Sequence, residues 1–522
     1  MSPRDRSRRP SNPLPKWTGL AVVLLVGAAI YFVYQWMSTT TLDQPDPDAA
    51  RLRVEVIRNA IGVGAGVGGL AALFLAFRRH QHNEHHDTEQ RIADLRIKAV
   101  DQLGSERSAV RIGGLHNLER LAEQHPSLRQ LVINELCAYL RMPYTPHAAR
   151  GSTSENDGAD DASTPSHQDP AATVDRDEER EVRLTAQRIL TRHLRQPRAE
   201  TTTTTGLRRI RAGMRRRSSS AYWDHDSIDL TGAYLYSPDF ENAELHNVVF
   251  TGVTLTGDAK FERTVFIGNA KFERTVFIGN AKFERTVFAG DADFERTAFN
   301  SRAGFERTVF MGNAEFAEAR FLGEAGFGGA RADGVARFLQ ATFRGDARFW
   351  EVTFKNDTAF TEARFERNAW FMHAAFNGYT WFRDARFSDD VGFDEATFAG
   401  LADFSKAAIA GDATFGRAAF KGDGEFIYTT ILGDARFDAA TFVRDAMFEG
   451  ATIRGDARFD AATFQGVATV GLAEFTRGPV GENARAVIDD RHEWPANWCL
   501  LKESNDPGWG RLVPDSYEVA PN

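Results

Sequence analysis

The chain has 522 residues, more than one compact domain usually holds, so two or more structural units are expected. Its formal net charge of −9 argues against a nucleic-acid or anionic-lipid surface over the whole molecule, because such surfaces are usually basic. The two cysteines, Cys137 and Cys499, lie far apart and form no CxxC motif, so neither a disulfide framework nor a cysteine zinc site is predicted.

Two apolar segments near the N-terminus predict transmembrane helices over 17–37 and 58–79. The first runs for about twenty residues without a charge, the length needed to cross the hydrocarbon core of a bilayer. A cleaved signal peptide is the alternative, but the run is too long and no A-x-A-like site follows it. In the second segment Gly64, Gly66 and Gly69 have GxGxxG spacing. Since no strand precedes them, we interpret them as glycines for close helix packing and not as a dinucleotide fingerprint.

The charges around these segments predict their orientation. The N-terminus, 1–16, is basic and the second segment is closed by Arg78, Arg79 and His80, whereas the link 38–57 carries three aspartates before Arg51. The positive-inside rule then places both termini and the rest of the chain in the cytoplasm and the link outside. The predicted localisation is the cell membrane, multi-pass, with membrane lipid as a partner of the two helices.

A small helical module is predicted over 80–145. Leucines recur there at helical spacing, Pro126 sits at the first turn of a helix, and Pro143 ends it. A histidine cluster opens the module, but its surroundings are polar and offer no carboxylate or cysteine at a defined spacing, so no metal is assigned to it. The cluster consists of His80, His82, His85 and His86.

Two linkers flank one more predicted helix. Residues 146–175 have almost no large apolar side chain and cannot offset the entropy of ordering, so a disordered linker is expected. An amphipathic helix follows over 176–196, and then a basic low-complexity linker over 197–221 with six arginines in 207–217. We interpret this basic run as a solvated tether, with contact to anionic lipid or nucleic acid as the alternative.

Phenylalanine marks a repeat over 222–476. The chain holds 40 Phe against 10 Tyr and 9 Trp, and an excess of one residue type indicates that one structural position is repeated. Large apolar residues fall every five positions from Leu230 to Leu255, and from Phe261 to Phe475 the gaps alternate between five and six. Ala332 takes the Phe position in one copy.

The spacing of small residues predicts the geometry of the repeat. The residue two before almost every Phe is small, so the two share the inward face of a short strand. Two residues after the second Phe of a unit comes Gly, often followed by Asp or Asn, and we expect tight turns with positive φ there. Such glycines are Gly268, Gly290, Gly345 and Gly433. Two units then make a four-sided coil of about 22 residues, with coils about 4.8 Å apart and Phe stacked on Phe.

The repeat resembles that of the pentapeptide-repeat proteins. LTGAYL and ENAEL carry A-[DN]-L-x-x-like copies, and FERTVFIGNAKF looks like a Phe-rich variant. The stretch DQLGSERSAVRIGGLHNLERLAEQHP resembles the helical segment before the repeats in actinobacterial membrane members of the family. The resemblance implies a right-handed quadrilateral β-helix. The predicted fold class is therefore mainly β, with this solenoid preceded by two transmembrane helices and a small α-helical region.

Residues 477–522 break the period and are predicted to form a C-terminal cap and tail, because the open end of a solenoid has to be covered. The cap would use the aromatic side chains of Trp494, Trp498 and Trp509 together with Leu500 and Leu501. An aromatic binding site is the alternative interpretation.

The sequence predicts a binding protein and not an enzyme. No nucleophile, general base and orienting group stand in a recognisable pattern, so no catalytic, cofactor-binding or metal-binding residue and no cofactor is assigned. The predicted function is a membrane-anchored scaffold that binds an unknown protein partner through the solenoid on the cytoplasmic side. The oligomeric state is left open.

The alternative function comes from the resemblance. Quinolone-resistance members of the family resemble duplex DNA in shape and charge and engage type II topoisomerases such as gyrase. Residues 228–475 hold 37 Asp and Glu against 26 Lys and Arg, a well-mixed surface that fits such mimicry poorly, and binding of nucleic acid itself is not expected. Asp412, Asp434 and Asp456 recur every 22 residues and are predicted to lie in one column, one coil apart.

Overall fold

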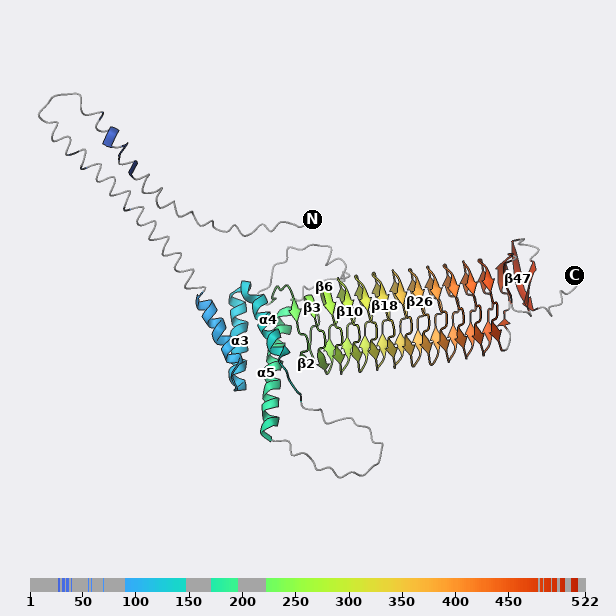
Figure 1. The fold of residues 1–522 in the computed structure, drawn as a ribbon, viewed down its shortest axis with the longest axis horizontal. Helices are drawn as coiled ribbons and strands as arrows, with labels where there is room; N and C mark the ends of the chain where they lie inside the picture. The colour runs from blue at the N-terminus through green and yellow to red at the C-terminus, as the bar shows by residue number, and fades with distance from the viewer. Residues whose placement is uncertain are drawn as a thin grey trace. The chain divides into compact units, whose positions relative to one another are not determined.

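A computed structural model describes residues 90–146, 170–195 and 222–514, together with a few isolated positions before residue 90. The last range is interrupted at 477–478, 482, 490, 495–497 and 503–507. The chain divides into two compact units, 1–95 and 96–522. In the first unit the described residues are isolated helical positions and the helical residues 90–95. The second holds a small helical module followed by a long β-solenoid (Figure 1).

The prediction of two transmembrane helices is corrected by the structure. Within the described residues, no helix has both the length and the apolar character needed to cross a membrane. The helices that are described alternate buried apolar faces with charged exposed ones, which is the pattern of helices that pack against protein on one side. Most of 17–37 and 58–79 lies outside the described residues. The predicted multi-pass localisation in the cell membrane depended on these two helices and is therefore corrected as well.

Other predicted segments also fall outside the described residues. These are the histidine cluster from His80 to His86, most of the linker 146–175, and the basic linker 197–221 apart from its last residues. The helix predicted over 176–196 begins earlier in the structure, at Pro170.

The helical module is built mainly from three α-helices, α3 (Ser108–Gln124), α4 (Arg129–Arg141) and α5 (Pro170–Leu194), with a 3-10 turn η1 (Pro126–Leu128) before α4. Each helix contacts the other two. Leu115, Leu118 and Ala122 recur every three or four residues along α3 and are buried, together with Leu136 of α4 and Ile189 of α5. The helical residues 96–103 precede α3, and their Ala99 is buried in the same core. The module therefore has an apolar core of its own, which is continuous with the core of the solenoid.

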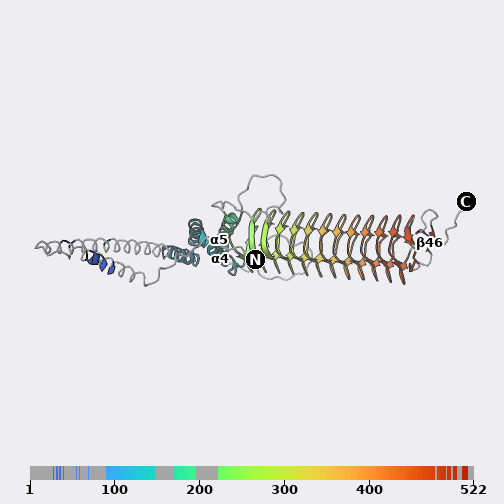
Figure 2. The ribbon, with the colours of Figure 1, turned by 90° about the horizontal axis from the view of Figure 1, so that it is seen from above.

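The helices α4 and α5 cover the N-terminal end of the solenoid (Figure 2). The side-chain amide of Gln187 forms two hydrogen bonds with the backbone of Tyr236 in β2 (Tyr234–Tyr236), at 2.7 and 3.0 Å. The backbone N–H of Trp223 donates to the carbonyl of His193 at 2.8 Å, and the Trp223 side chain is fully buried. The open edge of the first coil is thus covered by protein, as solenoid ends require.

Each coil of the solenoid contains four short parallel strands. One coil comprises β8 (Ala281–Lys282), β9 (Val287–Phe288), β10 (Ala292–Asp293) and β11 (Ala298–Phe299), and β12 (Ala303–Gly304) starts the next coil on top of β8. The strands stack into a 12-stranded, an 11-stranded and a 24-stranded sheet, and the last of these carries two faces of the rod. The predicted four-sided coil of 22 residues is confirmed.

The coil length changes near the start of the rod. Ile228 of β1 (Ile228–Asp229) pairs with Val248, a coil of 20 residues, as the five-residue spacing at the start of the repeats predicts. The register then shifts between His246 and Val248 where β3 (Glu244–Val249) pairs with β6 (Val265–Lys271), and coils of 22 residues follow.

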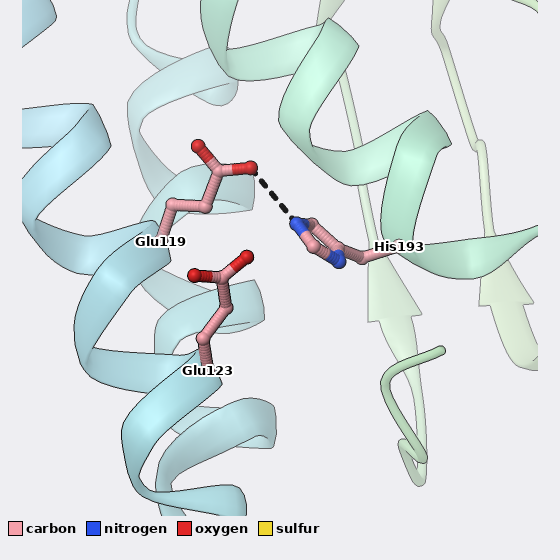
Figure 3. A group of neighbouring side chains, drawn as sticks. All are labelled: Glu119, Glu123 and His193. Atoms are coloured by element: carbon pink, nitrogen blue, oxygen red, sulfur yellow. Dashed lines mark hydrogen bonds and ion pairs between the residues drawn. The ribbon is translucent and has the colours of Figure 1, made fainter. Parts of the chain in front are cut away.

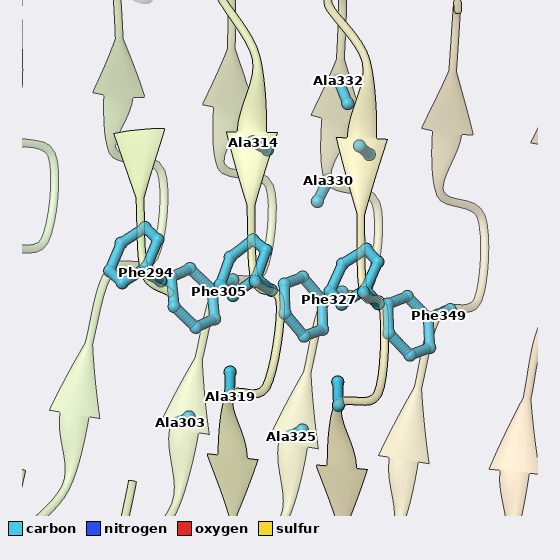
Figure 4. Close-up of a cluster of buried hydrophobic side chains, with 14 of the residues drawn as sticks. Phe294, Ala303, Phe305, Ala314, Ala319, Ala325, Phe327, Ala330, Ala332 and Phe349 are labelled. Carbon is cyan, nitrogen blue, oxygen red and sulfur yellow. The ribbon is translucent and has the colours of Figure 1, made fainter. Parts of the chain in front are cut away.

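Stacked phenylalanine rings form the core, as predicted. Phe261 and Phe283 lie one coil apart with ring centroids 4.8 Å apart and planes 3° from parallel, and Phe283 repeats this arrangement with Phe305 at 4.9 Å. Neighbouring columns meet edge to face, as Phe294 and Phe305 do at 5.5 Å and 86° (Figure 4). Both geometries are favourable for aromatic rings and add about 0.5–1.5 kcal/mol per pair beyond the burial of area.

Threonine beside the rings is also explained. Thr286 and Thr308 are fully buried, and their hydroxyls donate to the carbonyls of Phe261 and Phe283 at 2.6 and 2.7 Å. The buried hydroxyl therefore has a partner and carries no desolvation penalty. Either Ala or Thr can occupy this position without a change in the fold, because both side chains fill the same small space.

The predicted role of glycine in the turns was only partly right. Gly268 has a φ of +80°, but Gly290, Gly345 and Gly433 do not have positive φ. Glycine is required at Gly290 because a Cβ there would lie 2.5 Å from the backbone of Gly268 in the coil below. The left-handed residue of each unit lies instead two positions after Phe, for example at Arg263 with a φ of +57°. The close approach of stacked corners, and not backbone handedness, selects these glycines.

The far end of the rod changes from parallel to antiparallel pairing. β45 (Arg485–Val487) continues the stack on β41 (Thr463–Phe464) and pairs antiparallel with β47 (Trp509–Pro514), which forms a hairpin with β46 (Trp498–Lys502). Trp494 packs edge to face on Phe464 at 5.6 Å. Trp494, Trp498 and Leu512 border a small apolar cavity above the last Phe residues. No polar group of the described residues lines that cavity.

Replacing Phe349 by Ala should lower the free energy of unfolding by about 3–5 kcal/mol, because a fully buried ring is lost from the core. Phe349 stacks on Phe327 at 4.7 Å and on Phe371 at 4.9 Å. Chemical denaturation followed by circular dichroism measures the loss. The control is Arg348→Gln, which removes a half-exposed ion pair to Glu324 and should cost less than about 1 kcal/mol. Equal losses for the two variants would show that the inward and outward faces are wrongly assigned.

Candidate interaction surface

The outer positions of the repeat form columns of charged side chains with one residue per coil. Arg296 donates two hydrogen bonds to Glu318 one coil away, at 2.7 and 2.9 Å, and Arg417 pairs with Glu395 in the same way. These pairs are exposed, so each contributes at most about 1 kcal/mol to stability. As a result, positive and negative side chains lie side by side on the outer surface of the rod.

The predicted aspartate column is confirmed. The backbone N–H of Asp434 donates to Oδ1 of Asp412 at 2.8 Å, and that of Asp456 donates to Oδ1 of Asp434 at 2.9 Å. Arg436 also lies 3.6 Å from Asp412 and 3.2 Å from Asp434. The column is therefore a ladder that ties one corner of the coil to the next, with part of its charge balanced by arginine.

Large apolar side chains are exposed in the C-terminal third of the rod. Tyr428 is 59% and Leu472 is 89% exposed, and both lie in the column of left-handed residues, two coils apart. Gly450 lies between them, and a Cβ there would be 2.5 Å from Cδ1 of Tyr428. One edge of the tyrosine ring, with Cδ1 and Cε1, therefore lies over Gly450. We call Tyr428, Gly450 and Leu472 the apolar stripe.

A groove of about 710 Å³ runs along the N-terminal coils. The glutamate wall is the column formed by Glu241, Glu262, Glu284 and Glu306, and the arginine wall is the neighbouring column of Arg263, Arg285 and Arg307. In the next two coils Gly328 and Trp350 continue the first column, and Gly329 and Glu351 continue the second. Its lining residues are Glu241, Glu262, Arg263, Glu284, Arg285, Glu306, Arg307, Gly328, Gly329, Trp350 and Glu351. We call this surface the Glu/Arg groove.

The glutamate wall of the groove is only partly neutralised. Glu262, Glu284 and Glu306 each bury one carboxylate oxygen, Oε2, that has no hydrogen-bond partner. Arg302 pairs with Glu306, and Arg263 pairs with Glu241. Burial and the like charges of Glu306 and Glu262 raise the pKa of Glu284 above its usual value. The ionised form of this carboxylate is therefore destabilised.

The helical module holds one cluster with metal-ligand chemistry, formed by Glu119, Glu123 and His193 (Figure 3). One oxygen or nitrogen from each lies within 4.8 Å of the others. Glu119 and Glu123 are one turn apart on α3, and His193 comes from α5. Sequence analysis did not single these residues out, because Glu119 and His193 are 74 positions apart.

The contacts of this cluster are those of an ion-pair network. Nε2 of His193 lies 2.8 Å from Oε1 of Glu119, and Arg192 donates to the same oxygen at 3.0 Å. The His193 ring stacks on Trp223 at 4.0 Å. Burial would raise the pKa of Glu119, but the hydrogen bonds from His193 and His116 and the charge of Arg192 outweigh it and lower that pKa. These contacts join α3 to α5.

Comparison with known proteins identifies the repeats. A family model described as Pentapeptide repeats (9 copies) matches residues 240–287, 261–309, 283–331, 305–353, 338–386, 382–430 and 425–463. Together these matches run without a break from residue 240 to residue 463. Neither the curated proteins nor the solved structures contain a match to the chain.

Replacing Glu119 by Gln should destabilise the helical module by about 1–3 kcal/mol at neutral pH, because a charged partner of His193 is lost. Since the pKa of Glu119 is lowered by folding, its contribution is present above the ordinary glutamate pKa and disappears as pH falls through the folded value. The difference in Tm between wild type and variant should therefore shrink below about pH 4.

The control for this measurement is Glu123→Gln, because Glu123 is exposed and should leave Tm unchanged. A divalent cation that raised the Tm of the wild type, but not of Glu123→Gln, would contradict the ion-pair account and reveal a metal site.

Proposed function

Because residues 240–463 belong to the pentapeptide-repeat family, we propose that the solenoid is a scaffold for protein interaction and that the chain catalyses no reaction. The apolar stripe is the observation that carries this proposal. Exposed aromatic and aliphatic groups that stand together on a charged surface are typical of contact sites.

Binding of a partner to the apolar stripe should cost little side-chain entropy. The Tyr428 ring already lies across Gly450, so little side-chain entropy remains to be lost when a partner covers it. Leu472 is nearly fully exposed beside it. A partner that buried both side chains would gain about 1.5–3 kcal/mol from each of them.

The charged columns support specific recognition next to this stripe. Pairs such as Arg296–Glu318 and Arg417–Glu395 place opposite charges one coil apart on this surface. A partner with a complementary pattern would be favoured, and one with a different pattern would be rejected by like charges.

Mimicry of DNA towards gyrase is less well supported by these residues. It needs a free negative column, whereas Asp412 and Asp434 each accept a backbone hydrogen bond and lie beside Arg436. We therefore propose that the protein is a scaffold, and inhibition of gyrase serves as the test of the alternative function.

A photo-crosslinking amino acid at position 472 should trap one discrete partner in cells, because this position lies at the centre of the proposed contact. The adduct should be lost when Tyr428→Ser is added, since the aromatic anchor is gone. The matched control is Tyr379→Ser, which removes a tyrosine of similar exposure from another column and should leave the adduct in place.

The same preparation should not inhibit supercoiling by gyrase at micromolar concentration in low salt. Inhibition at low salt that added salt relieves would support mimicry of DNA, because such binding is electrostatic. Absence of any adduct at position 472, or an adduct that survives Tyr428→Ser, would overturn the scaffold proposal at this stripe.

A further inference from the structure

We propose that the Glu/Arg groove is a docking site for the basic segment 207–217 of the same chain, whose arginines neutralise the glutamate wall. This inference is independent of the scaffold proposal, because it concerns the opposite end of the rod. It rests on the charges of the groove, on the place where the segment leaves the fold, and on its length.

The glutamate wall presents negative charge that the described residues neutralise only in part. Glu262 and Glu284 lie one coil apart, and neither forms an ion pair within the described part of the chain. Each has a buried oxygen without a hydrogen-bond partner. A guanidinium group between the two carboxylates would relieve their repulsion and would supply several N–H donors in one plane.

The described residues that flank the basic segment lie beside the first residues of this groove. Arg195, after the end of α5, forms an ion pair with Asp239 and an isolated β-bridge with Ala243. Asp239 and Ala243 flank Glu241, the first residue of the glutamate wall. The chain returns at Trp223, whose N–H is bonded to His193. Both ends of the segment are therefore anchored beside the first coil.

The length of the chain outside the described residues is sufficient. From Arg195 to Arg208 there are 13 residue steps, which can span about 43 Å when extended. The groove extends from Glu241 to Trp350, five coil steps of about 4.8 Å, or about 24 Å. Arg208 can therefore reach any point of the glutamate wall, whereas Arg217, five residue steps before Tyr222, can lie at most about 17 Å from that end.

The composition of the segment matches this wall. The sequence LRRIRAGMRRR holds six arginines and no acidic residue. Arg285 and Arg307 on the opposite wall repel it, so the segment lies against the glutamates. At the far end, Trp350 is 47% exposed and offers a ring face to a guanidinium group.

Limited trypsin digestion of the full chain tests the proposal. Cleavage within 207–217 should be slow at low salt and accelerate when salt is added, because the contact is electrostatic. In Glu262→Gln/Glu284→Gln it should be roughly fivefold faster at low salt, given the usual strength of exposed ion pairs. The control is Glu395→Gln, which removes an exposed glutamate outside the groove and should leave the rate unchanged. Equal rates for wild type and double variant would overturn the proposal.

Crosslinking identifies the occupant directly. In a Cys499→Ser background, cysteines introduced by Met214→Cys and Arg285→Cys should be joined within one molecule by a short bismaleimide, and high salt should reduce the yield. Crosslinks found only between molecules would overturn the proposal in favour of a second copy of the chain. Absence of any crosslink in a variant with an unchanged circular dichroism spectrum would overturn it as well.

Discussion

The fold depends on a match between two distances. Parallel strands stack at about 4.8 Å, and phenylalanine rings lying face to face in this rod have centroids 4.7–5.1 Å apart along most of their columns. A phenylalanine at the same place in every coil therefore satisfies the backbone hydrogen bonds and the ring stack together. An insertion or deletion that changes the length of one coil would put both the strands and the ring stack out of register.

The rest of the repeat follows from this match. Four ring columns fill the interior, so only Ala, Thr or Val fits beside them, and Thr is accepted where its hydroxyl reaches a carbonyl, as at Thr286. At the corners the backbones of successive coils come so close that glycine is favoured there, as at Gly290, although Ser301 and Asp389 occupy the same position in their units. The outward positions are free of these demands, and the charges, the apolar stripe and the Glu/Arg groove all lie there.

The period of the sequence was enough to predict the features that repeat. The four-sided coil, the inward phenylalanines and the column from Asp412 to Asp456 all follow from a spacing of 22. What does not repeat could not be predicted in this way. The cover formed by α5 depends on Gln187 meeting Tyr236, and the network in the helical module on Glu119 meeting His193, and no local pattern links such residues.

Two predictions failed for physical reasons. Positive φ was expected at the corner glycines, but their requirement arises from contact between coils, and the left-handed turn falls on residues such as Arg263. Hydropathy alone predicted transmembrane helices, whereas no helix of the described residues can cross a membrane. The groove was missed because nothing in the repeat period distinguishes the outer columns that line it, or the change to Gly328, Gly329 and Trp350 at its end.

The most direct test of the stacking account compares two deletions by thermal unfolding with circular dichroism. Removal of residues 338–359, one whole coil, joins Arg337 to Phe360 and keeps every column in register, so the β-signal and a cooperative transition should be retained. Removal of residues 344–348 joins Phe343 to Phe349 and breaks the register, so the transition should broaden and the Tm should fall sharply. Equal tolerance of the two deletions would contradict the claim that the ring stack and the strand ladder together fix the coil.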